Sequence, residues 1–142
     1  MKYRNIIIYG GTSQIAINLI NLYANDCEKI IIFCRNLEKF KKLFNEYNQY
    51  KEKIEILEVD LNNLNKNLEI INEFNHDISG VFWISGFTGN SEAEYENISE
   101  AKTNLNLNFF NPTIIINELS KKLIKKQNSF IVAFTSVAGL RG

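Results

Sequence analysis

Short apolar runs rich in β-branched residues recur along the chain, and longer segments of mixed polarity separate them. The five runs, each too short for a helix, are residues 5–9, 29–34, 54–59, 80–84 and 130–135. Their apolar character is nearly continuous rather than alternating, which is typical of parallel strands covered by helices on both faces. We therefore predict five strands in one buried parallel sheet.

The segments between the runs have the spacing of amphipathic helices, with apolar residues at steps of three and four. The first stripe consists of Ile15, Leu19, Leu22 and Tyr23, and the second of Leu37, Phe40, Leu43, Phe44 and Tyr47. Residues 64–74 form the third predicted helix and residues 99–127 the fourth, whose stripe consists of Leu105, Phe109, Ile115, Leu119 and Leu123. Pro112, the only proline, is expected to bend the fourth helix because it lacks an N–H group.

Strands and helices alternate along the whole chain, and this order predicts an α/β fold. Right-handed crossovers then give a doubly wound, open parallel sheet with helices on both faces. In the nucleotide-binding version of this fold the strand order begins 3-2-1-4-5, and ligands bind at the carboxyl ends of strands one and four, where the order reverses. We expect residues 1–142 to form one domain with its site at this edge of the sheet.

Composition and charge exclude several other classes of protein. The 142 residues are 45% hydrophobic, enough for one core, and 16 basic residues balance 16 acidic ones, so we expect no nucleic-acid or anionic-membrane partner. The longest apolar runs, about five residues, are far short of the roughly twenty that span a bilayer. With only Cys27, Cys34 and His76 as soft ligands, we predict no disulfide framework and no metal site, and a reducing, cytoplasmic setting.

A glycine turn follows the first run and opens directly into the first predicted helix. Its sequence is Gly10-Gly11-Thr12-Ser13-Gln14-Ile15. Glycine permits a tight turn and a close approach to the backbone, the hydroxyls of Thr12 and Ser13 supply donors and an N-cap, and the free amides of a helix N-terminus favour anions. This pattern predicts a phosphate cradle, with a plain strand-to-helix turn as the alternative. A strict G-x-G-x-x-G is missing, and no P-loop sequence occurs.

Polar or small residues follow the next three runs at the same predicted edge. Cys34 and Arg35 end the second run; a guanidinium there can pair with a 2′-phosphate, so Arg35 favours NADP over NAD, with a solvated arginine at a helix start as the alternative. Asp60, after the third run, either accepts a hydrogen bond from an adenine amino group or caps the next helix. Ser85 and Gly86, after the fourth, would let the backbone pass close to a flat ligand.

Taken in order, these residues resemble the short-chain dehydrogenase/reductase family over essentially the whole chain. The glycine turn is similar to the family's T-G-x-x-x-G-x-G cofactor loop, with Tyr9, Gln14 and Ala16 in place of the threonine and the later glycines. Asp60 matches the aspartate that contacts adenine, and residues 84–86 stand where the family has N-N-A-G. The cofactor-binding residues that the resemblance implies are Gly10, Thr12, Ser13, Gln14, Ile15, Cys34, Arg35, Asp60, Leu61, Ser85 and Gly86.

Two further matches concern the family's catalytic residues. Asn108 matches the asparagine of the helix after the fourth strand, and Ser136, just after the fifth run, matches the serine that orients the substrate carbonyl. The resemblance therefore implies a Rossmann-type oxidoreductase that transfers hydride between NADP(H), or NAD(H), and a small-molecule carbonyl or secondary alcohol, including that of a sugar. Within the family, the sequences G-G-T-S-Q-I and S-V-A-G-L-R-G are most similar to reductases of polyprenyl-phosphate-linked 2-keto-pentofuranose.

The family's Tyr-x-x-x-Lys pair is expected about thirteen residues after Ser136, beyond Gly142, so we expect the first part of a longer enzyme, truncated after the fifth strand and inactive alone. We interpret the literal match from Tyr47 to Lys51 as chance. The resemblance also implies a homodimer or higher oligomer built through the fourth helix. Two other classes stay open: a non-catalytic NADP(H)-sensing module, and a flavodoxin-like or receiver-type domain without a dinucleotide.

Overall fold

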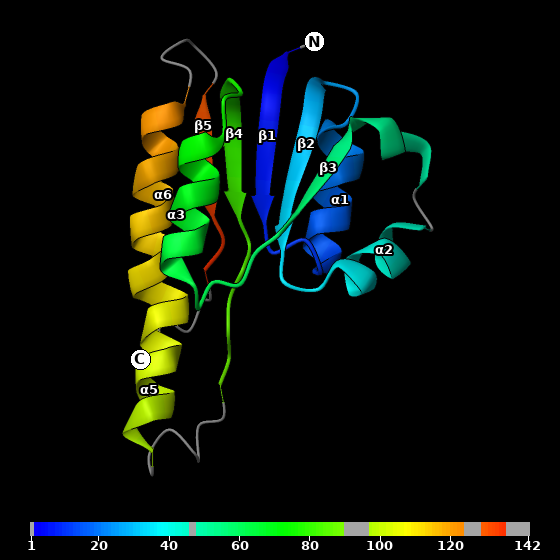
Figure 1. Ribbon diagram of the computed structural model, residues 1–142. Helices are drawn as coiled ribbons and strands as arrows, with labels where there is room; N and C mark the ends of the chain where they lie inside the picture. Colours follow the sequence, from blue (N-terminus) through cyan, green and yellow to red (C-terminus); the bar gives the residue numbers. More distant parts are fainter. Residues whose placement is uncertain (1, 46–47, 90–96, 124–128, 136–142) are drawn as a thin grey trace.

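The computed structural model describes residues 2–45, 48–89, 97–123 and 129–135 of the chain. Its five strands form one sheet in which every pairing is parallel, in the order β3-β2-β1-β4-β5 (Figure 1). The strands are β1 (Tyr3–Tyr9), β2 (Cys27–Cys34), β3 (Ile54–Glu58), β4 (Ile78–Trp83) and β5 (Phe130–Ala133). The predicted α/β fold, its five strands and its strand order are confirmed.

Helices cover both faces of this sheet. They are α1 (Gln14–Tyr23), α2 (Leu37–Asn45), α3 (Leu64–Glu73), α5 (Ile98–Leu105) and α6 (Asn111–Lys122), with a 3₁₀ turn at Asn48–Lys53 and a π-helical segment at Asn106–Phe110. α1 and α2 lie on one face, and α3 and α6 lie on the other (Figure 1). Within the described residues, no helix is long and apolar enough to cross a membrane.

The central strand β1 supplies apolar side chains to two separate cores. Ile6 and Ile8 pack with α1 and α2 on one face, whereas Ile7 and Tyr9 pack with α3 and α6 on the other. Successive side chains of a strand point to opposite faces, so a strand covered on both sides must be apolar throughout. This arrangement explains the nearly continuous apolar runs of the sequence.

The predicted apolar stripe of α1 is partly wrong. Leu22 is 67% exposed and Ile15 is also exposed, and the residues that enter the core are Ala16, Ile17, Leu19 and Ile20. The segment is apolar almost all the way round, so steps of three and four fit more than one face of the helix. The packing of α1 against β1 and β2 selects the buried face.

The predicted fourth helix is divided into α5, the π-helical segment and α6. The N–H of Asn111 donates to the carbonyl oxygen of Asn106, five residues earlier, and Pro112 follows at the start of α6. Proline has no N–H and crowds the carbonyl four residues before it, so the widened turn lies where an α-helical turn would clash. The irregularity therefore precedes Pro112.

The two halves of this helix differ in burial. Ile115 and Leu119 of α6 are buried against the sheet, as predicted, but Leu105 of α5 and Phe109 of the π-helical segment are exposed. Figure 1 shows the reason: α6 runs along the sheet, whereas α5 extends past its carboxyl edge. The stripe predicted for one continuous helix is wrong for these two residues.

Candidate functional site

A cleft opens at the carboxyl ends of the central strands, where the strand order reverses. Its lining comes from the ends of β1 to β4 and from the π-helical segment. The lining residues are Tyr9, Gly10, Thr12, Phe33, Cys34, Arg35, Val59, Asp60, Leu61, Ser85, Gly86, Phe87 and Leu107. The fold thus brings together most of the residues that the sequence nominated for cofactor binding. Ser13, Gln14 and Ile15 lie beside this lining, at the start of α1.

The glycine turn is wedged between β2 and β4. Gly10 has a φ of +103°, and a Cβ atom added to it would lie 2.8 Å from the backbone nitrogen of Ser85. The N–H groups of Gly10 and Gly11 both donate to the carbonyl oxygen of Phe33, at 2.9 and 3.3 Å. A Cβ atom on Gly11 would lie 2.2 Å from Cγ2 of Ile32. Both glycines are therefore required by the close approach of neighbouring strands.

Ser13 caps α1, as the sequence predicted. Its Oγ atom accepts a hydrogen bond from the N–H of Ile15 at 3.1 Å, and its own N–H donates to the carbonyl oxygen of Gly10 at 3.2 Å. Gln14 and Ile15 are exposed on the first turn of the helix, and Thr12 is half-buried in the cleft. The turn therefore presents the N-terminus of α1 next to the cleft, which favours an anionic group there.

Three stacked aromatic rings, which we call the floor, cross the sheet beneath the cleft. Tyr9 of β1 lies between Phe33 of β2 and Trp83 of β4, with ring centroids 4.3 and 4.6 Å apart and interplanar angles of 20°. These residues are register partners in adjacent strands. Burial raises the pKa of the Tyr9 hydroxyl, which donates to Oδ1 of Asn67 at 3.4 Å. The indole N–H of Trp83 donates to the carbonyl oxygen of Ser85 at 3.1 Å, so the floor also holds the segment after β4.

At the end of β2, a buried thiol is followed by an exposed guanidinium. Cys34 is buried, and desolvation raises the pKa of its thiol, which stays protonated at neutral pH. Asn36 caps α2, since its Oδ1 atom accepts from the N–H of Lys39 at 2.8 Å. Arg35 is exposed, lines the cleft and forms no ion pair with another described residue. Its charge is therefore available to an anion in the cleft.

The structure removes one of the two roles considered for Asp60. Asn63 caps α3, because its Oδ1 atom accepts from the N–H of Lys66 at 3.1 Å. Oδ1 of Asp60 instead accepts from the backbone and side-chain nitrogens of Asn62, at 3.0 and 3.1 Å. The helix-capping role of Asp60 is thus wrong. Its exposed carboxylate lies at the cleft beside Leu61.

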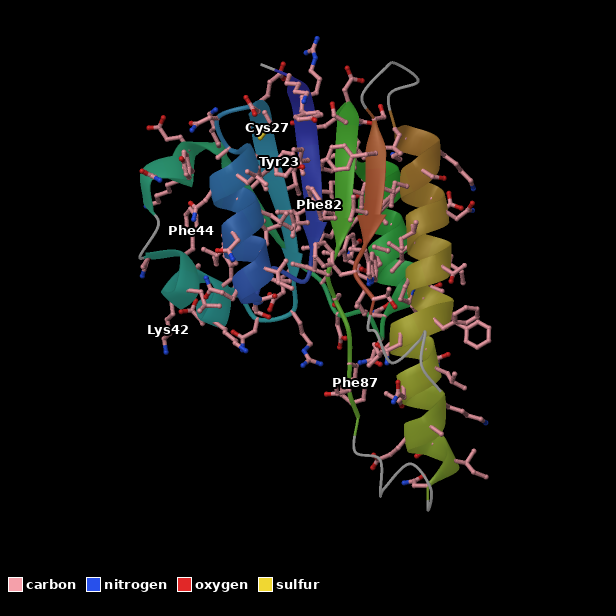
Figure 2. All side chains as sticks on the ribbon, turned by 180° about the vertical axis from the view of Figure 1, so that it is seen from behind. Tyr23, Cys27, Lys42, Phe44, Phe82 and Phe87 are labelled. Atoms are coloured by element: carbon pink, nitrogen blue, oxygen red, sulfur yellow. The ribbon has the colours of Figure 1, made fainter. Side chains whose placement is uncertain are left out.

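Asn108 clamps the backbone on the opposite side of the cleft. Its Nδ2 atom donates to the carbonyl oxygen of Phe87 at 2.6 Å, and its Oδ1 atom accepts from the N–H of the same residue at 2.8 Å. Its Nδ2 atom also donates to Oδ1 of Asn104. Figure 2 shows Phe87 on the extended segment that leaves the carboxyl end of β4. Ser136 lies outside the described residues, so its predicted role beside Asn108 stays a prediction.

Two residues that contribute to the site, Asn67 and Asn111, were missed by the sequence reasoning. Both are buried and hydrogen-bonded to the loop that carries Asp60 and Leu61. A signal existed: each occupies a position where the helical spacing calls for an apolar residue, three and four residues from Leu64 and Ile71 in α3, and four residues before Ile115 in α6. A polar residue within an apolar stripe indicates a buried hydrogen bond.

Comparison with known proteins identifies the family. The sequence profile of the short chain dehydrogenases matches residues 4–142. The chain belongs to the short chain dehydrogenase family. No curated protein sequence matches it significantly. The predicted resemblance to the short-chain dehydrogenase/reductase family is thereby confirmed.

Solved structures share this fold at low sequence identity. ElxO with NADP bound is 22% identical with a TM-score of 0.79 over 99% of this chain, and serine dehydrogenase from Escherichia coli is 15% identical with a TM-score of 0.77 over 97%. Pen from Bacillus thuringiensis is 22% identical with a TM-score of 0.72 over 96%. The chain spans 58%, 64% and 38% of the length of these three proteins.

Proposed function

We propose that this chain is the cofactor-binding portion of an NADP-dependent short-chain oxidoreductase that reduces a carbonyl or oxidises a secondary alcohol. The observation that carries the proposal is the convergence of the glycine turn, Arg35, Asp60 and the segment 84–86 on one cleft at the switch point of the sheet. Ligands of doubly wound folds bind at that position, and family membership favours a nicotinamide dinucleotide among them.

The lining of the cleft fits such a cofactor. Glycine at position 10 lets the segment after β4 lie against the glycine turn, and this turn presents the N-terminus of α1 next to the cleft, where it suits a phosphate group. The exposed guanidinium of Arg35 suits the 2′-phosphate of NADP, and the carboxylate of Asp60 suits the adenine amino group. The bound dinucleotide would supply the hydride. The residues of this chain would bind it, exclude water with the floor, and hold its two ends against the two sides of the cleft.

For the chemical step we propose that Ser136 orients the substrate carbonyl and that Asn108 organises the segment around Phe87 on the substrate side. The proton donor would be a tyrosine of a Tyr-x-x-x-Lys pair in a longer form of the protein. The substrate to test first is a keto-sugar, on the similarity of the two short sequences noted above. The alternative is a non-catalytic NADP(H) sensor, which the departures from the family's motifs at Gln14, Ala16 and Ser85 leave open.

Direct titration tests the proposal. The 142-residue chain is titrated with NADPH and with NADH, and binding is followed by calorimetry and by nicotinamide fluorescence. We expect binding of both, with NADPH the tighter ligand. If neither dinucleotide binds, the proposed function is wrong for this chain. A longer form that binds NADPH but reduces no carbonyl would favour the sensor.

We also propose that two copies of the chain associate through α5, the π-helical segment and the first turn of α6. The exposed large apolar residues of this region are Ile98, Leu105, Phe109, Phe110 and Ile114. Exposed large apolar residues that recur along one helical segment favour a protein–protein interface there. Light scattering at high micromolar concentration is expected to show a dimer or larger species, and Phe109→Asp is expected to shift it toward monomer. A monodisperse wild-type monomer would contradict the proposal.

A further inference from the structure

Two buried asparagines lie beneath one side of the cleft, the β3–α3 loop (residues 59–63). Asn67 of α3 is 0% exposed, and Asn111, the first residue of α6, is 8% exposed. A buried amide destabilises a fold unless it is hydrogen-bonded. The Nδ2 atoms of both asparagines find their hydrogen-bond acceptors in this one loop.

The partners are backbone carbonyl groups on the inner side of the loop. Nδ2 of Asn67 donates to the carbonyl oxygens of Asp60 and Asn63, at 2.8 Å each. Nδ2 of Asn111 donates to the carbonyl oxygen of Leu61 at 2.6 Å, across 50 positions of the sequence. Side chains from two different helices therefore hold the backbone of the loop from inside the protein.

The same loop lines the cleft with Val59, Asp60 and Leu61. Because the carbonyl groups of Asp60 and Leu61 are held from within, the directions in which these two residues present their side chains are also restricted. The bonds from Asn62 to the Asp60 carboxylate restrict that side chain further.

Asn111 also connects this loop to the other side of the cleft. It follows the π-helical segment directly, and Asn108, three residues earlier, clamps the backbone of Phe87. Leu107, the residue before Asn108, is buried and lines the cleft itself. Residues 108–111 thus join the loop after β3 to the segment after β4. The π-helical turn at Asn106–Phe110 sets the spacing between the side-chain amides of Asn108 and Asn111.

We propose that Asn111 is a positioning residue for the adenosine end of the cofactor. It acts through the carbonyl group of Leu61 and has no contact with the ligand of its own. This inference rests on the proposed function, because it assigns the β3–α3 loop to the adenosine half of the dinucleotide.

The test compares wild type with Asn111→Asp, which keeps the shape of the side chain and removes its donor. The affinities for NADPH and for adenosine 2′,5′-bisphosphate, which lacks the nicotinamide half, are expected to fall by the same factor, about three- to tenfold. Hydrogen exchange of the backbone amides of residues 60–63 is expected to accelerate, with the central strands unchanged. Asn117→Asp, an exposed asparagine on the same helix, is the matched control and should change neither.

Asn111→Ala removes the donor without adding charge, and it replaces the aspartate variant if that protein does not fold. Unchanged affinity for both ligands, even with a lower melting temperature, would overturn the inference and leave the proposed function standing. A loss confined to NADPH would overturn the assignment to the adenosine end. If wild type binds neither ligand, the proposed function fails and this inference fails with it.

Discussion

Tyr9 and Thr12 stand three positions apart in the sequence, and both line the cleft, yet their surroundings are opposite. Tyr9 is 1% exposed and stacks between two other rings of the floor. Thr12 is half-buried on the turn above it. We call Thr12, Arg35 and Asp60 the rim, since these side chains follow the ends of three strands around the opening.

The comparison separates stability from recognition. The floor removes large aromatic surfaces from water and packs them across three strands, which contributes to folding whether or not a ligand is bound. The rim consists of one half-buried and two exposed polar side chains whose loss costs folding little. Substitutions in the floor should therefore act on the free energy of unfolding, and substitutions in the rim should act on ligand affinity.

The largest effect is expected for Tyr9→Ala. Removing the middle ring leaves a cavity between Phe33 and Trp83 and should lower the free energy of unfolding by about 3–5 kcal/mol. Tyr9→Phe keeps the stack and loses only the bond to Asn67, so it should cost about 1 kcal/mol. Urea unfolding followed by circular dichroism measures both. Equal costs for the two variants would show that the stack contributes nothing.

Gly10→Ala is expected to affect the floor and the rim together. The alanine must adopt a positive φ, and its Cβ atom would lie 2.8 Å from the backbone nitrogen of Ser85. We therefore expect the free energy of unfolding to fall by about 2–3 kcal/mol and the affinity for NADPH to fall as well. Gly89→Ala also adds a methyl group at a positive φ and controls for the backbone conformation. Equal effects of the two variants would contradict the contact with Ser85.

Arg35→Ala tests the rim alone. Loss of the guanidinium should weaken NADPH about tenfold and leave NADH unchanged, since only NADPH carries the 2′-phosphate. The free energy of unfolding should change by less than about 0.5 kcal/mol. Calorimetric titration measures the affinities, and Lys42→Ala, an exposed cation on α2 labelled in Figure 2, is the matched control. Equal weakening of both dinucleotides would exclude recognition of the 2′-phosphate by Arg35.

The smallest effect is a loss of stability at alkaline pH. Burial raises the pKa of the Cys27 thiol from 9.0 to about 11 and raises the pKa of the Tyr9 hydroxyl in the same direction. The folded protein thus keeps protons that the unfolded chain releases, so the free energy of unfolding should decline as the pH rises above about 9. Urea unfolding at a series of pH values measures the slope, which Cys27→Ala should reduce. A slope that is identical in this variant would exclude a contribution from Cys27.

Much of the fold was predictable because its signals are local. Five apolar runs, the helical spacing between them and the glycine turn at Gly10 led to the sheet and to the position of its cleft. Rim residues such as Arg35 and Asp60 were predictable for the same reason, since each directly follows a strand. The buried face of α1 was not, because Leu22 and Leu19 are equivalent in periodicity, and only the contact with β1 and β2 distinguishes them.

The sequence by itself determined the order of the elements and the residues that follow each strand, because hydrophobic period and turn chemistry act between near neighbours in the chain. Tertiary structure alone decided that Tyr9 stacks between Phe33 and Trp83 and that Asn111 holds Leu61. The stack and the Asn111 bond join residues far apart in the sequence. Such contacts depend on strand register and helix placement, which form only when the whole sheet assembles.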